Sequence, residues 1–308
     1  MQKKYSGITV PAPTPVNPDE TVNEQGYRDL IEFMIQNGID GVFACGTLGE
    51  TMQLTQAERN RAIRIAADQA KGRIKIFGGV MDTGTKRVIE NVKAIEDSGA
   101  DAVVLTPVFY ERHTSQSEII RLFEDTAKET KLDLVAYNIP PFVIEKIEPA
   151  TVIALSQIDQ VKCYKDSGAN FNETVKVLDA LKDNPDFTVL SGTPLQYIPS
   201  AFAGADGCVP SMASLYPRMF AEANKACQEK DYEKMLQYHH FILEAGKIYG
   251  AAKNGTAAVK YAASLLGFFD PRIIRPADGV TEAEAEKIRA QKAKCDALFE
   301  EAGCASVL

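Results

Sequence analysis

The stretch Val161-Lys162-Cys163-Tyr164-Lys165-Asp166-Ser167-Gly168 is a short run of strand-forming residues that ends in a lysine. The serine and glycine that follow predict a turn directly after it. A lysine this close behind apolar residues is shielded from bulk water, and desolvation disfavours its ammonium form. A neutral amine can attack a carbonyl and form a Schiff base. The alternative is a lysine at a strand end that simply reaches solvent.

Runs of the same kind recur along the first two thirds of the chain, with helical patterns between them. The eight predicted strands cover residues 7–10, 41–45, 75–80, 101–105, 132–137, 160–164, 187–190 and 206–209. Strands that alternate with helices predict a parallel sheet, and several of these runs are apolar throughout, as strands buried on both faces are. Eight such units favour an α/β fold, a closed (β/α)8 TIM barrel. The main alternative is a doubly wound open sheet, which would usually have a glycine-rich loop where this chain has Pro11-Ala12-Pro13-Thr14-Pro15.

The strand patterns stop at about residue 230, and three helical patterns follow, over residues 231–249, 257–266 and 282–301. We therefore expect a catalytic barrel over residues 1–230 and a C-terminal helical region, a three-helix extension, over residues 231–308. No low-complexity linker separates the two, so we expect the extension to be docked. The sequence does not choose between packing on the barrel and building a subunit interface.

Composition excludes several classes of function. The net charge is -8 with a pI near 5.1, and no arginine-rich tract is present, so we expect no nucleic-acid partner. No apolar run reaches the length of a membrane span, and no signal-peptide pattern follows the first residues, which predicts a cytoplasmic protein without a membrane partner. Six scattered cysteines and three histidines (His113, His239 and His240) offer no metal-ligand spacing, so we expect no metal.

The predicted strands end in polar residues and glycines. Active sites of such barrels lie at the C-terminal ends of the strands. The second strand runs into Gly46-Thr47-Leu48-Gly49-Glu50, whose successive backbone N–H groups and threonine hydroxyl suit a carboxylate. A plain strand-to-helix turn is the alternative. Glu50 fits a structural acceptor for loop N–H groups better than an acid catalyst.

Tyr137 ends the predicted strand that precedes the strand of Lys165. Neighbouring parallel strands lie about 4.8 Å apart, so the two side chains can meet over one substrate. A phenol beside a Schiff-base lysine can shuttle protons. The alternative is a rim tyrosine with a packed ring and a hydrated hydroxyl.

Together these residues resemble the dihydrodipicolinate synthase / N-acetylneuraminate lyase family of class I pyruvate-dependent aldolases. The resemblance spans nearly the whole chain and rests on Gly46-Thr47-x-Gly49-Glu50, Thr106-Pro107 with Tyr110, Tyr137-Asn138-Ile139-Pro140 and Lys165-Asp166-Ser167. It implies a barrel with a C-terminal three-helix region, assembled as a homotetramer. It also implies that Lys165 forms a covalent imine with pyruvate or another 2-oxo acid, without a separate cofactor. Tyr137 would relay protons, and Thr47, Gly46 and nearby amides would bind the pyruvyl carboxylate.

The chain departs from the family pattern at positions that select the second substrate. Leu48 replaces a threonine, and Phe142 stands where the synthases have an arginine for the carboxylate of the aldehyde. The synthase tyrosine of the fourth-strand loop aligns with Phe109, which leaves Tyr110 as the nearest phenol for the relay. The sugar-acid lyases have an acidic residue after the glycine of the seventh strand, and this chain has Gly192-Thr193-Pro194. These departures argue against dihydrodipicolinate synthesis, weaken the sugar-lyase interpretation, and predict a less charged distal pocket.

Three hypotheses follow. The first is a Schiff-base lyase that makes or breaks a carbon–carbon bond in a 2-oxo acid, with pyruvate as product or substrate. The second keeps Lys165 but acts on sugar acids, as a dehydratase of a 2-keto-3-deoxy sugar acid or a lyase like N-acetylneuraminate lyase. The third is a non-catalytic binding barrel, against which the Lys165–Tyr137 pair argues. Borohydride trapping with pyruvate separates the third from the others, and product analysis separates the first two.

Overall fold

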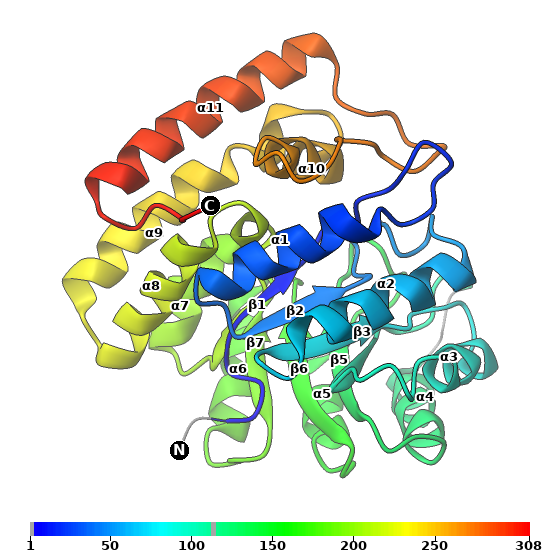
Figure 1. Cartoon of the computed structure of the whole chain (residues 1–308). Coiled ribbons are helices and arrows are strands. Elements are labelled where there is room, and N and C mark those ends of the chain that lie inside the picture. Colours follow the sequence, from blue (N-terminus) through cyan, green and yellow to red (C-terminus); the bar gives the residue numbers. More distant parts are fainter. Residues whose placement is uncertain (1–2, 112–114) are drawn as a thin grey trace.

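The computed structural model describes residues 3–111 and 115–308, and in them eight parallel strands close into a barrel (Figure 1). The strands are β1 (Gly7–Pro11), β2 (Gly41–Ala44), β3 (Lys75–Gly79), β4 (Ala102–Leu105), β5 (Asp133–Asn138), β6 (Val161–Asp166), β7 (Thr188–Ser191) and β8 (Gly207–Cys208). They pair in chain order, and β8 returns to β1. The predicted TIM barrel is therefore confirmed.

Helices follow the strands and cover the outside of the barrel. They are α1 (Glu24–Gln36), α2 (Gln56–Ala70), α3 (Thr85–Lys93), α4 (Gln116–Ala127), α5 (Pro149–Leu155), α6 (Phe171–Leu181), α7 (Tyr197–Phe202) and α8 (Pro217–Glu229). Short 3-10 helices, η1 (Pro194–Gln196) and η2 (Ser211–Ser214), follow β7 and β8. In the described part of the chain, no helix combines the length and the apolar character needed to cross a membrane.

Alternation along the strands divides the apolar side chains into two layers. Successive residues of a strand point to opposite faces of the sheet. On β6, Cys163 belongs to the cluster inside the barrel, and Tyr164 belongs to the larger cluster between strands and helices. Phe43, Val135 and Tyr137 also belong to the inner cluster. Lys165 lies two residues after Cys163, so the same alternation turns it toward the barrel interior.

The barrel closes where glycines allow the backbones to approach. A Cβ atom on Gly207 would lie 2.0 Å from the carbonyl oxygen of Gly7, its register partner on β1. Gly7 itself has a φ of +100°, which side-chain-bearing residues rarely adopt. The closing strand β8 has 2 residues, fewer than the predicted run of residues 206–209, because its ladder ends at Cys208.

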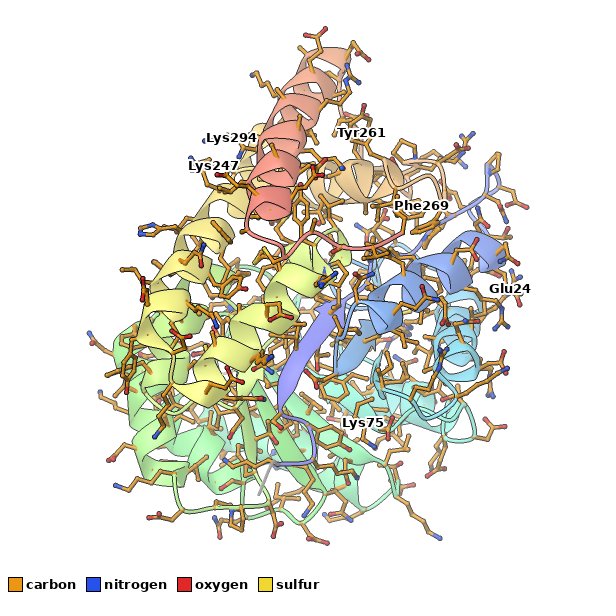
Figure 2. The ribbon with its side chains drawn as sticks, turned by 60° about the vertical axis from the view of Figure 1, so that its left-hand side comes forward. Glu24, Lys75, Lys247, Tyr261, Phe269 and Lys294 are labelled. Atoms are coloured by element: carbon orange, nitrogen blue, oxygen red, sulfur yellow. The ribbon has the colours of Figure 1, made fainter. Side chains whose placement is uncertain are left out.

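The predicted three-helix C-terminal extension is also confirmed, as α9 (Tyr232–Gly246), α10 (Gly255–Ser264) and α11 (Glu282–Glu301). Figure 1 shows α10 and α11 at the end of the barrel away from the N-terminus. The carboxylate of Glu244 on α9 accepts from Lys247 at 2.5 Å and from Lys294 of α11 at 2.7 Å, and Figure 2 shows these two lysines close together. The extension is docked on the barrel, as expected, because Lys260 of α10 pairs with Glu50 in the loop after β2. Its status as a separate domain beginning at residue 231 stays a prediction.

Candidate active site

Lys165 and Tyr137 are register partners on the adjacent strands β6 and β5. Both side chains are buried, at 5% and 3% exposure, and the Lys165 Nζ atom lies 3.8 Å from the centroid of the Tyr137 ring. It also lies 5.0 Å from the centroid of Phe43, whose ring meets Tyr137 edge-on. Among the ion pairs of the described residues, none involves Lys165. The structure thus brings a buried lysine amine onto two aromatic faces and leaves it available for chemistry.

The carboxylate of Asp166 fixes the turn that follows Lys165. One oxygen accepts from the Asn138 amide and from the Gly168 N–H, both at 2.9 Å, and the other accepts from the Thr174 hydroxyl at 2.7 Å. The Asn138 carboxamide oxygen in turn accepts from the N–H of Ile147 at 3.0 Å. No role was predicted for these polar groups from the sequence. Alternation along the strands could have indicated this role. Asn138 and Asp166 directly follow Tyr137 and Lys165, so their side chains face the opposite side of the sheet, toward the helices.

The loop after β2 offers unpaired donors to the same space. Among the described hydrogen bonds, none uses the backbone N–H groups of Thr47 and Leu48, although the loop carbonyls accept from other residues. The Gly49 carbonyl, for example, accepts from the Thr14 hydroxyl at 2.9 Å. Gly46 packs on the Phe43 ring, 2.8 Å from where a Cβ would stand. Adjacent free N–H groups beside a hydroxyl can bind a carboxylate.

These groups line a cavity of about 420 Å³. Six of the site residues predicted from the sequence line this cavity: Thr47, Leu48, Tyr137, Lys165, Gly192 and Thr193. A seventh, Phe142, is 60% exposed and lies at the edge of the cavity. Gly192 is required there because the Ser167 hydroxyl occupies the space that a Cβ would take, at 2.1 Å. Hence the predicted substrate-binding residues other than Gly46 line one cavity with Lys165 and Tyr137, and Gly46 packs on Phe43 without lining the cavity.

The C-terminal extension supplies a wall that the sequence analysis missed. Tyr249 from η3 (Tyr249–Ala251) and Thr256 from α10 line this cavity and a neighbouring one of about 960 Å³, which also shares Thr47, Ile139 and Phe142. The Tyr249 ring lies against Gly255, where a Cβ would be 2.3 Å away. No local sequence pattern predicts this wall, because the wall depends on how the extension docks on the barrel.

Tyr110 is the one predicted catalytic residue that the structure does not bring to the cavities. Its side chain is 84% exposed, at a φ of 83°, and neither cavity includes it. Its neighbour Phe109 lines the larger cavity instead. A role for Tyr110 as a second phenol stays a prediction.

Two cysteines close to the site are held as thiols. Burial raises the pKa of Cys45, directly before Gly46, to about 12 and raises the pKa of Cys163 well above its ordinary value. A thiolate is the reactive form of cysteine, so neither residue competes with the lysine as a nucleophile at neutral pH. Within the described residues no group of three His, Cys, Asp or Glu side chains could hold a metal ion, and His113 lies outside those residues.

The family of the chain follows from residues 4–294, which match the model of the Dihydrodipicolinate synthetase family. The chain belongs to this family. It is 33% identical over 215 residues to the 4-hydroxy-tetrahydrodipicolinate synthase of Methanosphaera stadtmanae, covering 68% of this chain and 72% of that protein. Members of the family are class I aldolase-type carbon–carbon lyases, and the chain is an enzyme of this class.

Two solved structures share the fold over nearly their full length. Dihydrodipicolinate synthase from Bacteroides thetaiotaomicron superposes with a TM-score of 0.90 at 30% identity, covering 96% of this chain and 100% of that one. YagE, a prophage protein of the same family from Escherichia coli, solved in complex with pyruvate, gives a TM-score of 0.90 at 25% identity, covering 95% and 99%. The resemblance to this family that the motifs indicated is thereby confirmed.

Proposed function

We propose that this enzyme makes or breaks a carbon–carbon bond next to a 2-oxo acid through an imine on Lys165, with pyruvate as substrate or product. The observation that carries the proposal is the buried, unpaired amine of Lys165 over the Tyr137 ring, in a cavity that also contains Thr47. The pyruvate complex of the Escherichia coli relative supports the choice of 2-oxo acid. No metal or separate cofactor enters this chemistry, because the imine itself is the electron sink.

The reaction begins when the neutral amine adds to the ketone carbon of pyruvate and water leaves. In this proposal Tyr137 carries protons to and from the oxygen that departs, as a positioned general acid and base. The pyruvyl carboxylate accepts from the Thr47 hydroxyl and from the free N–H groups of Thr47 and Leu48. The imine withdraws electrons from the methyl carbon, which loses a proton and attacks the aldehyde; cleavage runs the same steps backwards.

The second substrate in this proposal is an uncharged hydroxyaldehyde. Lys165 is the sole charged residue among the described residues that line the smaller cavity. Hydroxyls of Ser167, Thr193, Ser211 and Thr256 line the same cavity and can bind substrate hydroxyls. Phe142 cannot replace a bidentate arginine for a carboxylate. We therefore propose that dihydrodipicolinate synthesis is not the main activity, and the same hydroxyls keep the sugar-acid lyase or dehydratase as the second candidate.

The test has two stages. Borohydride reduction with pyruvate, followed by peptide mass spectrometry, should give one adduct, on Lys165; no adduct would refute imine chemistry. A parallel kinetic assay then compares aspartate semialdehyde with neutral hydroxyaldehydes, with product analysis for water loss. Efficient turnover of the semialdehyde would refute our choice of second substrate.

We also propose a homotetramer. Two groups of exposed apolar side chains support it: Met52, Tyr110, Phe142 and Ile144 on the loops around the cavities, and Phe202, Tyr232 and Leu236 on α7 and α9. Two different self-complementary faces build a tetramer with three twofold axes. Light scattering after size exclusion measures the assembly, and Phe202→Glu should reduce it to dimers; a wild-type monomer would contradict the proposal.

A further inference from the structure

Lys260 on α10 is a fully buried lysine that reaches into the rim of the barrel. Its side chain has 0% exposure and its ammonium pairs with the carboxylate of Glu50, itself 3% exposed, from the loop after β2. Among the ion pairs of the described residues, this is the one in which both side chains are below a tenth exposed. The two residues stand 210 positions apart in the chain.

Both oxygens of the Glu50 carboxylate are used by the C-terminal extension. The first binds Lys260, and the second accepts from the backbone N–H of Ile274, between α10 and α11, at 2.7 Å. The carboxylate is therefore a structural hydrogen-bond acceptor, and both of its oxygens are engaged, so neither is free for acid–base catalysis. This agrees with the expectation that Glu50 is a structural acceptor, although its partners come from the far end of the chain.

The backbone of Glu50 is hydrogen-bonded to the residue that carries the Thr47 hydroxyl. Its φ of 56° is left-handed, a conformation that residues with a side chain adopt only when the surroundings hold them. Its N–H donates to the Thr47 carbonyl at 3.1 Å, and its carbonyl accepts from Gln53 and Leu54. A side chain anchored at both oxygens can hold this strained backbone, so the anchor acts on the loop that contains the free N–H groups.

The pair is poorly explained as a source of stability. Removing two charges from water costs about as much as their attraction returns, so a buried ion pair is weak evidence for stability and is better attested as a device that fixes geometry. Lys260 also follows Thr256 by one helical turn, so both face the same side of α10. Fixing Lys260 on Glu50 therefore fixes the wall that Thr256 contributes to both cavities.

We propose that the Glu50–Lys260 pair is a positioning device that holds the loop of residues 46–50 in the shape that receives the substrate carboxylate. The proposal rests on the proposed function for the identity of that carboxylate, which is pyruvate. Neither residue touches the substrate in this scheme. The C-terminal extension thereby sets the affinity of the enzyme for its 2-oxo acid from outside the barrel.

The test compares Glu50→Gln, Lys260→Met and the double variant with Asn37→Ala. Asn37, which caps the C-terminal end of α1, is the matched control, because its buried side chain also ties the barrel to the C-terminal tail, through both backbone groups of Val307, away from the cavities. The readouts are the pyruvate concentration that half-saturates borohydride trapping, kcat at saturating pyruvate, Tm, and amide exchange of residues 46–54.

We expect each single variant to raise the half-saturating pyruvate concentration by about ten- to a hundredfold, the scale of a displaced binding group, with kcat much less affected. The double variant leaves no unpaired charge, so its Tm should recover while its pyruvate requirement stays raised. Asn37→Ala should lower Tm alone. Two outcomes would overturn the proposal. In the first, the half-saturating pyruvate concentration of the double variant returns to the wild-type value together with Tm. In the second, the half-saturating pyruvate concentration rises as much in Asn37→Ala as in the single variants.

Amide exchange separates this proposal from the proposed function, because it needs no substrate. Exchange over residues 46–54 should speed up in Glu50→Gln and in the double variant but not in Asn37→Ala. If wild-type protein is never trapped by pyruvate, the proposed function fails, and the exchange result still decides whether the pair holds the loop. Unchanged exchange in a folded Glu50→Gln or double variant refutes the positioning role.

Discussion

The amine of Lys165 lies 3.8 Å from the centre of the Tyr137 ring, so the lysine contacts the aromatic face of its register partner. The ring face attracts a cation, whereas the hydroxyl at the ring edge can exchange a proton. One substitution separates these two contributions, since phenylalanine keeps the face and lacks the hydroxyl.

Tyr137→Phe should lower kcat by about two to four orders of magnitude, the usual effect of losing a positioned proton-transfer group. Imine trapping with pyruvate should persist, because the lysine and its aromatic surroundings remain. Tyr5→Phe is the control: Tyr5 is an inner-core tyrosine whose hydroxyl donates to Asp133 at the other end of the barrel. A kcat in Tyr137→Phe equal to that of the wild type would show that the Tyr137 hydroxyl does not relay protons.

Lys165→Met should abolish the borohydride-trapped pyruvate adduct, because no other lysine among the described residues lines the smaller cavity. Lys162→Met is the matched control on the same strand: Lys162 pairs with Asp159 and lies outside the cavity. Intact-protein mass spectrometry measures the adduct in both. A stoichiometric adduct in Lys165→Met, mapped to a different lysine, would contradict the assignment.

Asp166→Ala should destabilise the protein by about 2–5 kcal/mol, because two buried donors and one half-buried donor lose a charged acceptor. Urea unfolding measures the loss, best reported as a shift of the midpoint. Asp159→Ala, whose side chain is 95% exposed, should change stability by less than about 0.5 kcal/mol. Equal effects of the two variants would show that the Asp166 network does not hold the turn.

Phe142→Arg should raise kcat/KM for aspartate semialdehyde by about ten- to a hundredfold, the worth of a hydrogen-bonded ionic contact of roughly 1.5–3 kcal/mol. The new guanidinium would stand at the edge of both cavities, where the aldehyde carboxylate lacks a partner. Ile144→Arg, at a neighbouring exposed position, should give no gain. Steady-state kinetics compares the three proteins, and an equal gain in both variants would point to long-range attraction rather than a contact.

The contact of Glu244 with α11 should weaken in acid. Hydrogen bonds from Lys247, and then from Lys294, lower the pKa of Glu244 from 4.5 to about 2. A carboxyl with a lowered pKa in the folded protein contributes stability above pH 4.5 and loses it as the pH falls toward 2. Glu244→Gln should therefore be less stable than wild type at neutral pH, by up to about 1 kcal/mol because the lysines are exposed, and should converge with it in acid. A difference in stability that does not depend on pH would contradict this.

The sequence predicted the barrel because its strands are local signals, short apolar runs between helices. It also predicted the Lys165–Tyr137 pair, since adjacency of parallel strands follows from chain order. The start of α2 shows where such local signals end: the Thr55 hydroxyl accepts from the Glu58 N–H, as in a capping box, but the Glu58 carboxylate accepts from the N–H of Val22. A partner outside the helix competed successfully for that side chain.

Long-range features escaped prediction. Thr256 and Tyr249 reach the cavity because of how α10 and η3 dock, and docking leaves no periodic pattern in the sequence. The pairing of Glu50 with Lys260 likewise depends on a contact across most of the chain. Tyr110 lies in a loop, 84% exposed and with a left-handed φ of 83°, and the strand and helix patterns of the sequence do not predict the conformation of such a loop.

The 210 positions between Glu50 and Lys260 also separate the two residues in time. At about 5–20 residues per second, a ribosome releases Lys260 roughly ten to forty seconds after Glu50. β1 and β2 precede Glu50, and the other six strands, β3 to β8, emerge within that interval. A nascent barrel can therefore assemble while the Glu50 carboxylate still lacks its cation. Biosynthesis thus delays completion of the catalytic rim until after the scaffold, and a chain released before residue 260 lacks the lysine even if its barrel has folded.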